Sequence, residues 1–343
     1  MTLVANAVRD LGLKWASLRR EVKEVEAILE MQSGLNELDA KLRTVLPEEY
    51  QEGYEDIQPI SMGSASLKFD AANQVAWDEI WDHFCDLAMA GGPPHKGKLL
   101  EPASPLQVAA QPDRYRAVVQ ELCRGIRMVS TLAVEPSPNP GWIRVLCSTD
   151  VMAEWMVRAI VMENVTARLQ GSVVELPAGP HYRLEKEIKN VVTVIAKTFH
   201  YFDGHIGNRQ QRRIAAEFAS ASAPLLQPGW PADFGTLDGF IDAKANAARE
   251  IAEATGLRAG GAEYVGWLGL ECPDVRSAIW MMRALVVNNT LARREDEFVY
   301  VPVHPMLDPE GSRVAKAVAM VHRYAVGRGI CSRDSPEKPT PIE

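Results

Sequence analysis

The sequence predicts an α+β fold in which two internally duplicated halves follow an N-terminal helical hairpin. The first observation is a stretch beginning at Gly141 that recurs, without a gap, from Gly266. The second is that segments of alternating apolar residues, typical of strands, are interspersed with segments of helical periodicity. The third is a run of apolar residues at alternate steps of three and four within residues 10–46, which predicts the hairpin. A chain of 343 residues is long enough for two domains with a core each.

The repeat keeps a constant offset of 125 residues, which is the difference between Gly141 and Gly266. About 15 of roughly 40 aligned positions are identical, well above the level expected of a chance self-comparison. Residues present in both halves can therefore be separated from residues present in only one. The identical pairs include Cys147 with Cys272, Trp155 with Trp280, Arg158 with Arg283, Asn164 with Asn289, and Pro177 with Pro302.

Composition and charge argue against several classes of protein. The net charge is −8 and the basic residues form no clustered stripe, which argues against a nucleic-acid partner. The longest apolar runs, such as residues 191–196, are too short to span a bilayer, and the N-terminus lacks the apolar core of a signal peptide. The five cysteines are scattered and never form Cys-x-x-Cys, so we expect reduced thiols. These features predict a cytoplasmic protein without a membrane partner.

Residues 10–46 carry the pattern that predicts the hairpin. Ser33-Gly34 is the expected turn, because glycine suits a left-handed helix end. The apolar stripe could face the body of the chain, or it could face a second subunit and make a homo-oligomer through residues 10–46. The stripe consists of Trp15, Leu18, Val22, Val25 and Leu29, followed by Leu35, Leu38, Leu42 and Val45.

The order of strands and helices in the first half is β-α-β-β-α-β with a trailing helix, an order that resembles a ferredoxin-like sandwich. The expected elements are a strand at 64–69, a helix at 75–89, a strand at 98–100, a helix at 114–128, a hairpin of 131–134 with 142–147, a helix at 151–165, a strand at 172–176 and a helix at 184–201.

In the second half we expect fewer elements, with no evident counterpart of the strand and loop in 61–112. Its expected elements are helices at 237–254, 275–290 and 312–324 and strands at 264–270 and 297–301. The predicted domains are a hairpin at 1–60, a first α/β repeat at 61–202, a linker or lid at 203–237, a second α/β repeat at 238–330 and a disordered tail at 331–343.

Arg158 and Arg283 are the most informative of the shared residues. Each lies in a helix that is apolar nearly all round, where an unpaired guanidinium would be costly. Glu154 could pair with Arg158 from four residues earlier, but Ile279 takes that position before Arg283. The role common to both arginines is therefore a contact outside the local helix. The partner is either a carboxylate elsewhere in the fold or a bound substrate with a carboxylate or phosphate group.

Two further pairs of shared residues lie at helix ends. Cys147 and Cys272 fall where a strand ends and a helix begins, and a helix N-terminus can activate a thiol by stabilising its thiolate. Cysteine is also one of the residues most often buried in a core, so both interpretations stay open. Asn164 and Asn289 lie near the ends of their helices, where asparagine tolerates left-handed backbone and caps carbonyl groups.

A glycine-rich loop at 91–97 has no counterpart in the second half. It is not a Walker phosphate-binding loop, because it lacks a Gly-Lys-Ser/Thr ending. Its glycines would let backbone N–H groups approach a phosphate or carboxylate, and its lysines would add positive charge. The same residues also read as an ordinary rigid turn. The candidate substrate-binding residues here are Gly91, Gly92, Lys96 and Lys98, and the candidate for proton transfer is His95.

His200, Asp203 and His205 carry side chains suited to a divalent metal. Two histidines five residues apart do not share a face of an α-helix, so this metal site would need a bend at Gly204. His200 could instead act as a general acid or base. It could also pack, since His322 takes a similar helix-end position in the second half.

These residues together predict a cytoplasmic enzyme that acts on a small anionic metabolite bound between the halves. Arg158 and Arg283 would hold the anion, the loop at 91–97 would wrap it, and His95 or His200 would move protons. The only cofactor indicated is a divalent metal, and no motif names a reaction. The alternative is a non-catalytic binding or assembly protein that uses the N-terminal hairpin for partner contacts.

Overall fold

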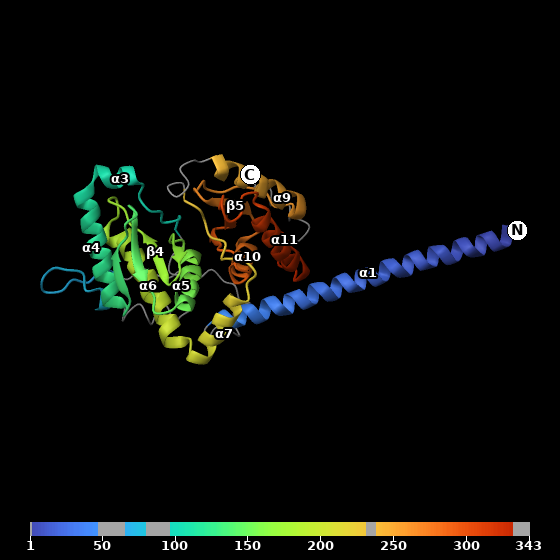
Figure 1. The fold of residues 1–343 in the computed structure, drawn as a ribbon, viewed down its shortest axis with the longest axis horizontal. Coiled ribbons are helices and arrows are strands. Elements are labelled where there is room, and N and C mark those ends of the chain that lie inside the picture. Colours follow the sequence, from blue (N-terminus) through green and yellow to red (C-terminus); the bar gives the residue numbers. More distant parts are fainter. Residues whose placement is uncertain (1, 47–65, 80–96, 231–237, 332–343) are drawn as a thin grey trace, which may run out of the picture.

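The computed structural model describes residues 2–46, 66–79, 97–230 and 238–331, with the backbone alone for 2–18 and 20. Within these ranges the chain is α+β, with two small antiparallel sheets and a larger share of helix. Figure 1 shows the two sheets with their helices side by side and the N-terminal helix projecting far beyond them. No helix in the described ranges is both long and apolar enough to cross a membrane.

The first half contains a four-stranded antiparallel sheet covered by helices. The strands are β1 (Ala133–Pro136), β2 (Trp142–Leu146), β3 (Arg168–Gln170) and β4 (Val173–Pro177), and the helices are α3 (Pro105–Ala110), α4 (Pro112–Val129), α5 (Asp150–Met162) and α6 (Lys189–His200). The strand order is β1-β2-β4-β3, and Trp142 pairs with Pro177 at one end of the central ladder. α6 packs between α4 and α5, which contact β1 and β4 respectively.

Three short helical segments adjoin α6 or connect the halves. A π-helical turn, η2 (Leu184–Ile188), leads into α6, and a second, η3 (Tyr201–His205), follows it. The helix α7 (Asn208–Ala219) then runs towards the second half.

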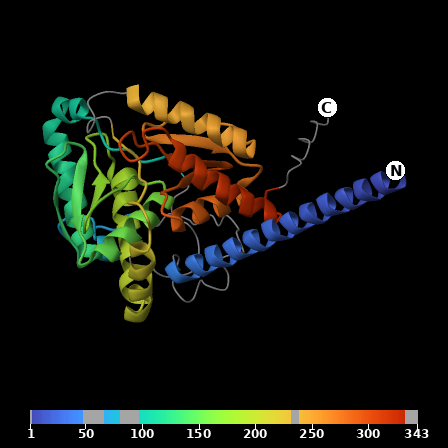
Figure 2. The ribbon, with the colours of Figure 1, turned by 45° about the vertical axis from the view of Figure 1, so that its right-hand side comes forward.

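The second half repeats this arrangement with a three-stranded sheet. Its elements are α9 (Asp238–Thr255), β5 (Trp267–Glu271), α10 (Val275–Val287), β6 (Arg293–Glu295), β7 (Phe298–Pro302) and α11 (Ser312–Gly327). The strand order is β5-β7-β6, and Trp267 pairs with Pro302 as Trp142 does with Pro177. α9 and α11 pack against each other (Figure 2), as α4 and α6 do in the first half.

The elements of the two halves correspond at the offset of 125 residues found in the sequence. Both ends of α5 and α10 differ by 125. Their N-caps also correspond: the Thr149 side chain accepts from the backbone of the third helical residue, as the Asp274 side chain does. Ala259 forms an antiparallel bridge with Leu270, which repeats the β1–β2 pairing of the first half. The second sheet therefore retains one bridge at the place of β1.

The correspondence extends into a segment that the sequence placed in the linker. Leu100 forms a parallel bridge with Val165, and Leu226 forms the same bridge with Thr290. A Leu-Leu-x-Pro sequence occupies both places, at 99–102 and at 225–228, with an offset of 126. The second half therefore has a counterpart of the bridge at Leu100, which the sequence comparison did not predict.

The predicted N-terminal hairpin is also wrong, because α1 (Thr2–Val45) is one continuous helix. Gly34 does not end a helix. It lies against α11, where an added Cβ would clash with Tyr324 Oη, so glycine serves close packing here. Burial of one leucine contributes about 1.5–3 kcal/mol, and three of them fix this end of α1 to the second half. These leucines are Leu35, Leu38 and Leu42.

Two expected strands and one expected helix of the first half differ from the structure. Phe69 and Leu100 each form only an isolated bridge, with Val75 and Val165, in the parts of 64–69 and 98–100 that are described. Of the helix expected at 75–89, the described part is helical over 77–79, and residues 80–96 lie outside it. The tail at 332–343 lies outside it as well.

The apolar cores of the two halves meet. The cluster beneath the first sheet also contains Trp267, Leu291 and Tyr300, which belong to the second half. Leu226, from the loop after α7, joins the cluster beneath the second sheet. The halves therefore bury apolar surface against one another, rather than only within themselves.

Candidate anion-binding pocket

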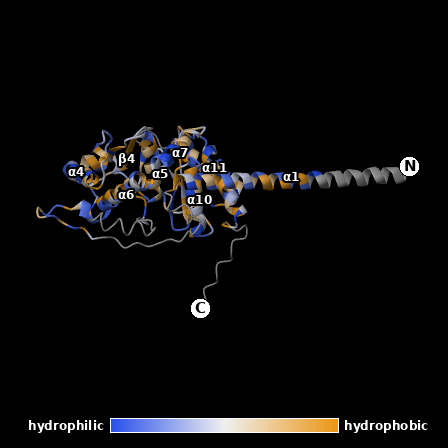
Figure 3. Cartoon of the chain, turned by 90° about the horizontal axis from the view of Figure 1, so that it is seen from below, coloured by the Kyte–Doolittle hydropathy of each residue, from blue (hydrophilic) through white to orange (hydrophobic). Residues whose placement is uncertain are grey.

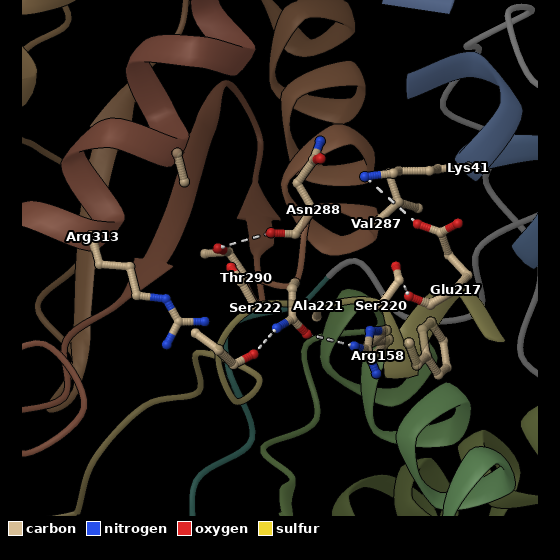
Figure 4. Close-up of a pocket in the computed structure, with 14 residues that line it drawn as sticks. Lys41, Arg158, Glu217, Ser220, Ala221, Ser222, Val287, Asn288, Thr290 and Arg313 are labelled. Carbon is tan, nitrogen blue, oxygen red and sulfur yellow. Dashed lines mark hydrogen bonds and ion pairs between the residues drawn. The ribbon is translucent and has the colours of Figure 1, made fainter. Parts of the chain in front are cut away.

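A pocket of about 320 Å³ lies where the two halves meet α1 and α7. Figure 4 shows side chains from both halves and from α1 around it. Junctions between domains are common places for small ligands. The polar residues that line the pocket are Lys41, Arg158, Glu217, Ser220, Ser222, Asn288, Asn289, Thr290 and Arg313.

Arg158 of α5 is the most buried charged residue of this pocket, at 5% exposed. Its Nη1 donates to the backbone oxygen of Glu154 at 2.7 Å and to Glu154 Oε2 at 3.2 Å. Its Nη2 donates to Asn289 Oδ1 at 2.9 Å, and its guanidinium carbon lies 3.9 Å from the centre of the Phe218 ring. Its buried Nε has no hydrogen-bond acceptor among the described residues. The contact outside the helix is therefore the side-chain amide of Asn289, where the sequence predicted a carboxylate or a bound anion.

The pocket carries more positive than negative charge. Burial lowers the pKa of Arg158 to about 10, partly offset by Glu154, so the guanidinium stays protonated at neutral pH. Burial also lowers the pKa of Arg313, whose Nη2 donates to the backbone oxygen of Pro224. Lys41 lies 3.6 Å from Glu217, the only carboxylate among the described lining residues. Three cations and one carboxylate therefore line the pocket, while Lys41 also pairs with Glu37 at 3.0 Å and Arg158 with Glu154 at 3.2 Å.

Asn289 and its counterpart Asn164 hold the halves together reciprocally. Both have a left-handed backbone with φ of 58°. Each amide nitrogen donates to the loop of its own half, from Asn289 to the Ala223 oxygen at 2.7 Å and from Asn164 to the Gly97 oxygen at 3.0 Å. Each side-chain oxygen accepts from an arginine of the other half, and for Asn164 this is Arg293 Nη1 at 3.2 Å. Their identity in both halves and their expected left-handed backbone were the available signals, but neither predicts a contact between the halves.

Arg283 does not line this pocket. It is half-buried, and burial lowers its pKa, with a smaller contribution from the nearby charge of Arg294. The prediction that two shared arginines hold one anion is therefore wrong for this pocket. Lys41 and Arg313 contribute the remaining positive charge, and comparison of the halves gave no signal for them because both lie outside the repeated stretch.

Most residues of the glycine-rich loop lie outside the described ranges. Gly91, Gly92, His95 and Lys96 lie outside the described residues, so their assignments stay predictions. Lys98 is described, is exposed, and does not line the pocket.

His200 and His205 do lie together, with their Nε2 atoms 3.0 Å apart. The π-helical turn η3 produces this contact, because a π-helix brings residues five apart onto one face. Burial and then His205 lower the pKa of His200, while Asp203 raises it. Asp203 is exposed, and the described residues contain no group of three His, Cys, Asp or Glu that could hold a metal. Neither histidine lines the pocket, so a catalytic role for His200 stays a prediction.

Cys147 and Cys272 are core residues. Both are buried, and burial raises the pKa of each thiol to about 12. Each sulfur lies near that of a methionine in the following helix, at 4.0 Å from Met156 and 3.9 Å from Met281. Thiols with such a raised pKa are not activated nucleophiles.

Comparisons of the chain with protein-family models, with curated proteins and with solved structures find no match.

Proposed function

We propose that this protein binds a small anion, with a carboxylate or phosphate group, in the pocket between its halves. The observation that carries the proposal is that Arg158, Arg313 and Lys41 line one pocket whose lining holds a single carboxylate, that of Glu217. An anion in the pocket would accept charge-assisted hydrogen bonds from these side chains.

Binding is better supported than a particular reaction. None of the described residues that line the pocket is a histidine or a cysteine, and Glu217 is the only carboxylate. The cytoplasmic enzyme predicted from the sequence would need Glu217, or a residue outside the described ranges such as His95, for proton transfer. Enzymatic activity, its location and any metal therefore stay predictions.

The recurrence of strand registers and helix caps at one offset supports the inference that the halves are copies of one ancestral unit. A ferredoxin-like origin for that unit also stays a prediction. Duplication would explain why a pocket with cations from several elements lies at the junction, since neither copy alone encloses it.

The test of binding uses inorganic phosphate and malonate as probes, with chloride at equal ionic strength as the reference. At ten times its dissociation constant, a bound ligand raises the free energy of unfolding by about 1.4 kcal/mol. We expect this increase in the native protein and at least a tenfold weaker affinity in Arg313→Met, measured by calorimetric titration. Arg313 is chosen because Arg158 also joins the halves, so its replacement would confuse binding with folding.

Arg249→Met is the matched control, because it removes the same charge from an exposed position of α9 that does not line the pocket. It should bind the probes as the native protein does. Equal affinities for Arg313→Met, Lys41→Met and Arg249→Met would refute the pocket as the anion site.

A further inference from the structure

The projecting part of α1 exposes an apolar stripe. Every described side chain from residue 19 to residue 30 is exposed. Among them are Val22, Val25, Ile28 and Leu29, which are 51–64% exposed. Figure 3 shows this segment extending away from the body, with apolar and polar residues alternating along it. From this segment we infer that α1 pairs in antiparallel orientation with α1 of a second copy of the chain.

The stripe does not continue the one that contacts the body. At 100° per residue, the mean direction of Val22, Val25 and Leu29 differs by roughly 140° from that of the buried leucines at 35, 38 and 42. It therefore points almost directly away from the second half. A second helix can pack along it without displacing α10 or α11. The two readings of the helical pattern, packing on the body and pairing with a subunit, thus apply to different parts of one helix.

The projecting helix carries both attractive and repulsive charge pairs. Residues four apart place Arg20 near Glu24 with opposite charges, but Arg19 near Lys23 and Glu26 near Glu30 with like charges, which destabilise a helix. Most helical stability in proteins comes from tertiary packing of an apolar face. A partner helix would supply the missing contacts through the stripe.

The spacing of the stripe fits a second copy of itself. In the sequence, apolar residues occur at 15, 18, 22, 25 and 29, which is the alternation of a two-stranded coiled coil. In antiparallel orientation, Val22 can face Val25 of the partner subunit, and the segment 15–32 then pairs with itself over about 27 Å. The contact is symmetric and closes on two chains.

The charges beside the stripe select the orientation. Arg19 and Glu26 both take the e position of the heptad, next to the seam. With Val22 facing Val25 of the partner subunit, Arg19 faces Glu26 of the partner subunit twice across the symmetry axis. A parallel pair would instead bring Glu21 next to Glu26 and Lys14 next to Arg19, so like charges would meet. Charge complementarity therefore favours the antiparallel dimer.

The test is a charge-reversal series on the full chain, with the oligomeric state measured by sedimentation equilibrium. We expect the native protein to be a dimer. Arg19→Glu and Glu26→Arg should each weaken the dimer at least tenfold, and the double variant should recover most of the loss, because the attractive pairs are restored with their signs exchanged. Both side chains are exposed, so folding should be unchanged, which circular dichroism checks.

Glu24→Arg is the matched control, because Glu24 is exposed on the opposite side of the same helix. It should leave the dimer unchanged. A native protein that is still monomeric at a concentration of about 100 µM would overturn the inference. So would a tighter dimer in Arg19→Glu or Glu26→Arg, since both changes relieve the repulsion of a parallel pair. The outcome is independent of anion binding, because none of these residues lines the pocket.

Discussion

Asn289 combines a left-handed backbone with two hydrogen bonds that reach different parts of the molecule. Its φ of 58° suits asparagine or glycine, while other side chains lose about 1–2 kcal/mol there. Its amide fixes the loop at Ala223, and its oxygen accepts from Arg158 of the other half. The loop and the guanidinium both line the pocket, so one side chain positions two of its walls.

We expect Asn289→Ala to lower the free energy of unfolding by about 2–4 kcal/mol, because it adds backbone strain and leaves the Arg158 Nη2 without its acceptor. Asn289→Gly should cost about 1 kcal/mol less, since glycine removes the strain. Urea unfolding measures both. Asn73→Ala is the control for strain alone, because Asn73 has the same φ of 58° and an exposed side chain. If Asn289→Ala costs no more than Asn73→Ala, the hydrogen bonds between the halves contribute nothing.

The sequence identified Arg158 and Asn289 as shared residues but could not show that they contact one another. Their partner positions lie more than a hundred residues apart, and periodicity reports only the face of a local element. Lys41 and Arg313 were missed for a related reason. A cation on an amphipathic helix is usually solvated, and only the packing of α1 and α11 turns these two towards a common pocket.

At the scale of an element, α1 shows the limit of reading glycine as a helix end. The apolar spacing correctly predicted helix over residues 10–46. Glycine, however, serves both left-handed turns and close helix packing, and the choice depends on a neighbour that the local sequence does not contain. That neighbour is Tyr324 of α11.

We expect Gly34→Ala to destabilise the native protein, because its Cβ must displace the Tyr324 ring from α1. The same change should become stabilising, by up to about 1 kcal/mol, in a Tyr324→Ala background, where only the higher helix propensity of alanine remains. Urea unfolding of the four proteins measures the coupling as a double-mutant cycle. Ser33→Ala, at an exposed neighbouring position, should change stability little in either background. Absence of a sign change would mean that Gly34 is not required for packing.

At the scale of the whole molecule, the two halves have corresponding strand registers, and each half donates hydrogen bonds to the other. The repeat was readable because identical residues kept one offset over roughly forty positions. The loops at 99–102 and 225–228 were missed because one extra residue shifts their offset to 126, and few identities mark them. The sequence could not predict the contacts between the halves, because each contact joins residues more than a hundred positions apart.

The contacts that each half makes with the other predict that the two halves unfold together. Arg158 and Arg293 each donate to an asparagine of the other half, and the first apolar cluster contains Trp267 and Tyr300. A half that separated would expose this apolar surface and lose acceptors for buried arginines, each loss costing about 1–3 kcal/mol. We therefore expect a single calorimetric transition, with calorimetric and van't Hoff enthalpies equal.

Hydrogen exchange gives the sharper form of this prediction. Amides of the β2–β4 ladder and of the β5–β7 ladder should exchange with the same free energy of opening, because neither sheet is stable without the other. In a double variant, Asn164→Ala with Asn289→Ala, both ladders should lose protection by equal amounts, since the two substitutions remove the reciprocal contacts at once. Protection lost from one ladder alone, or two resolved calorimetric transitions, would mean that the halves are independent domains whose contacts contribute little to stability.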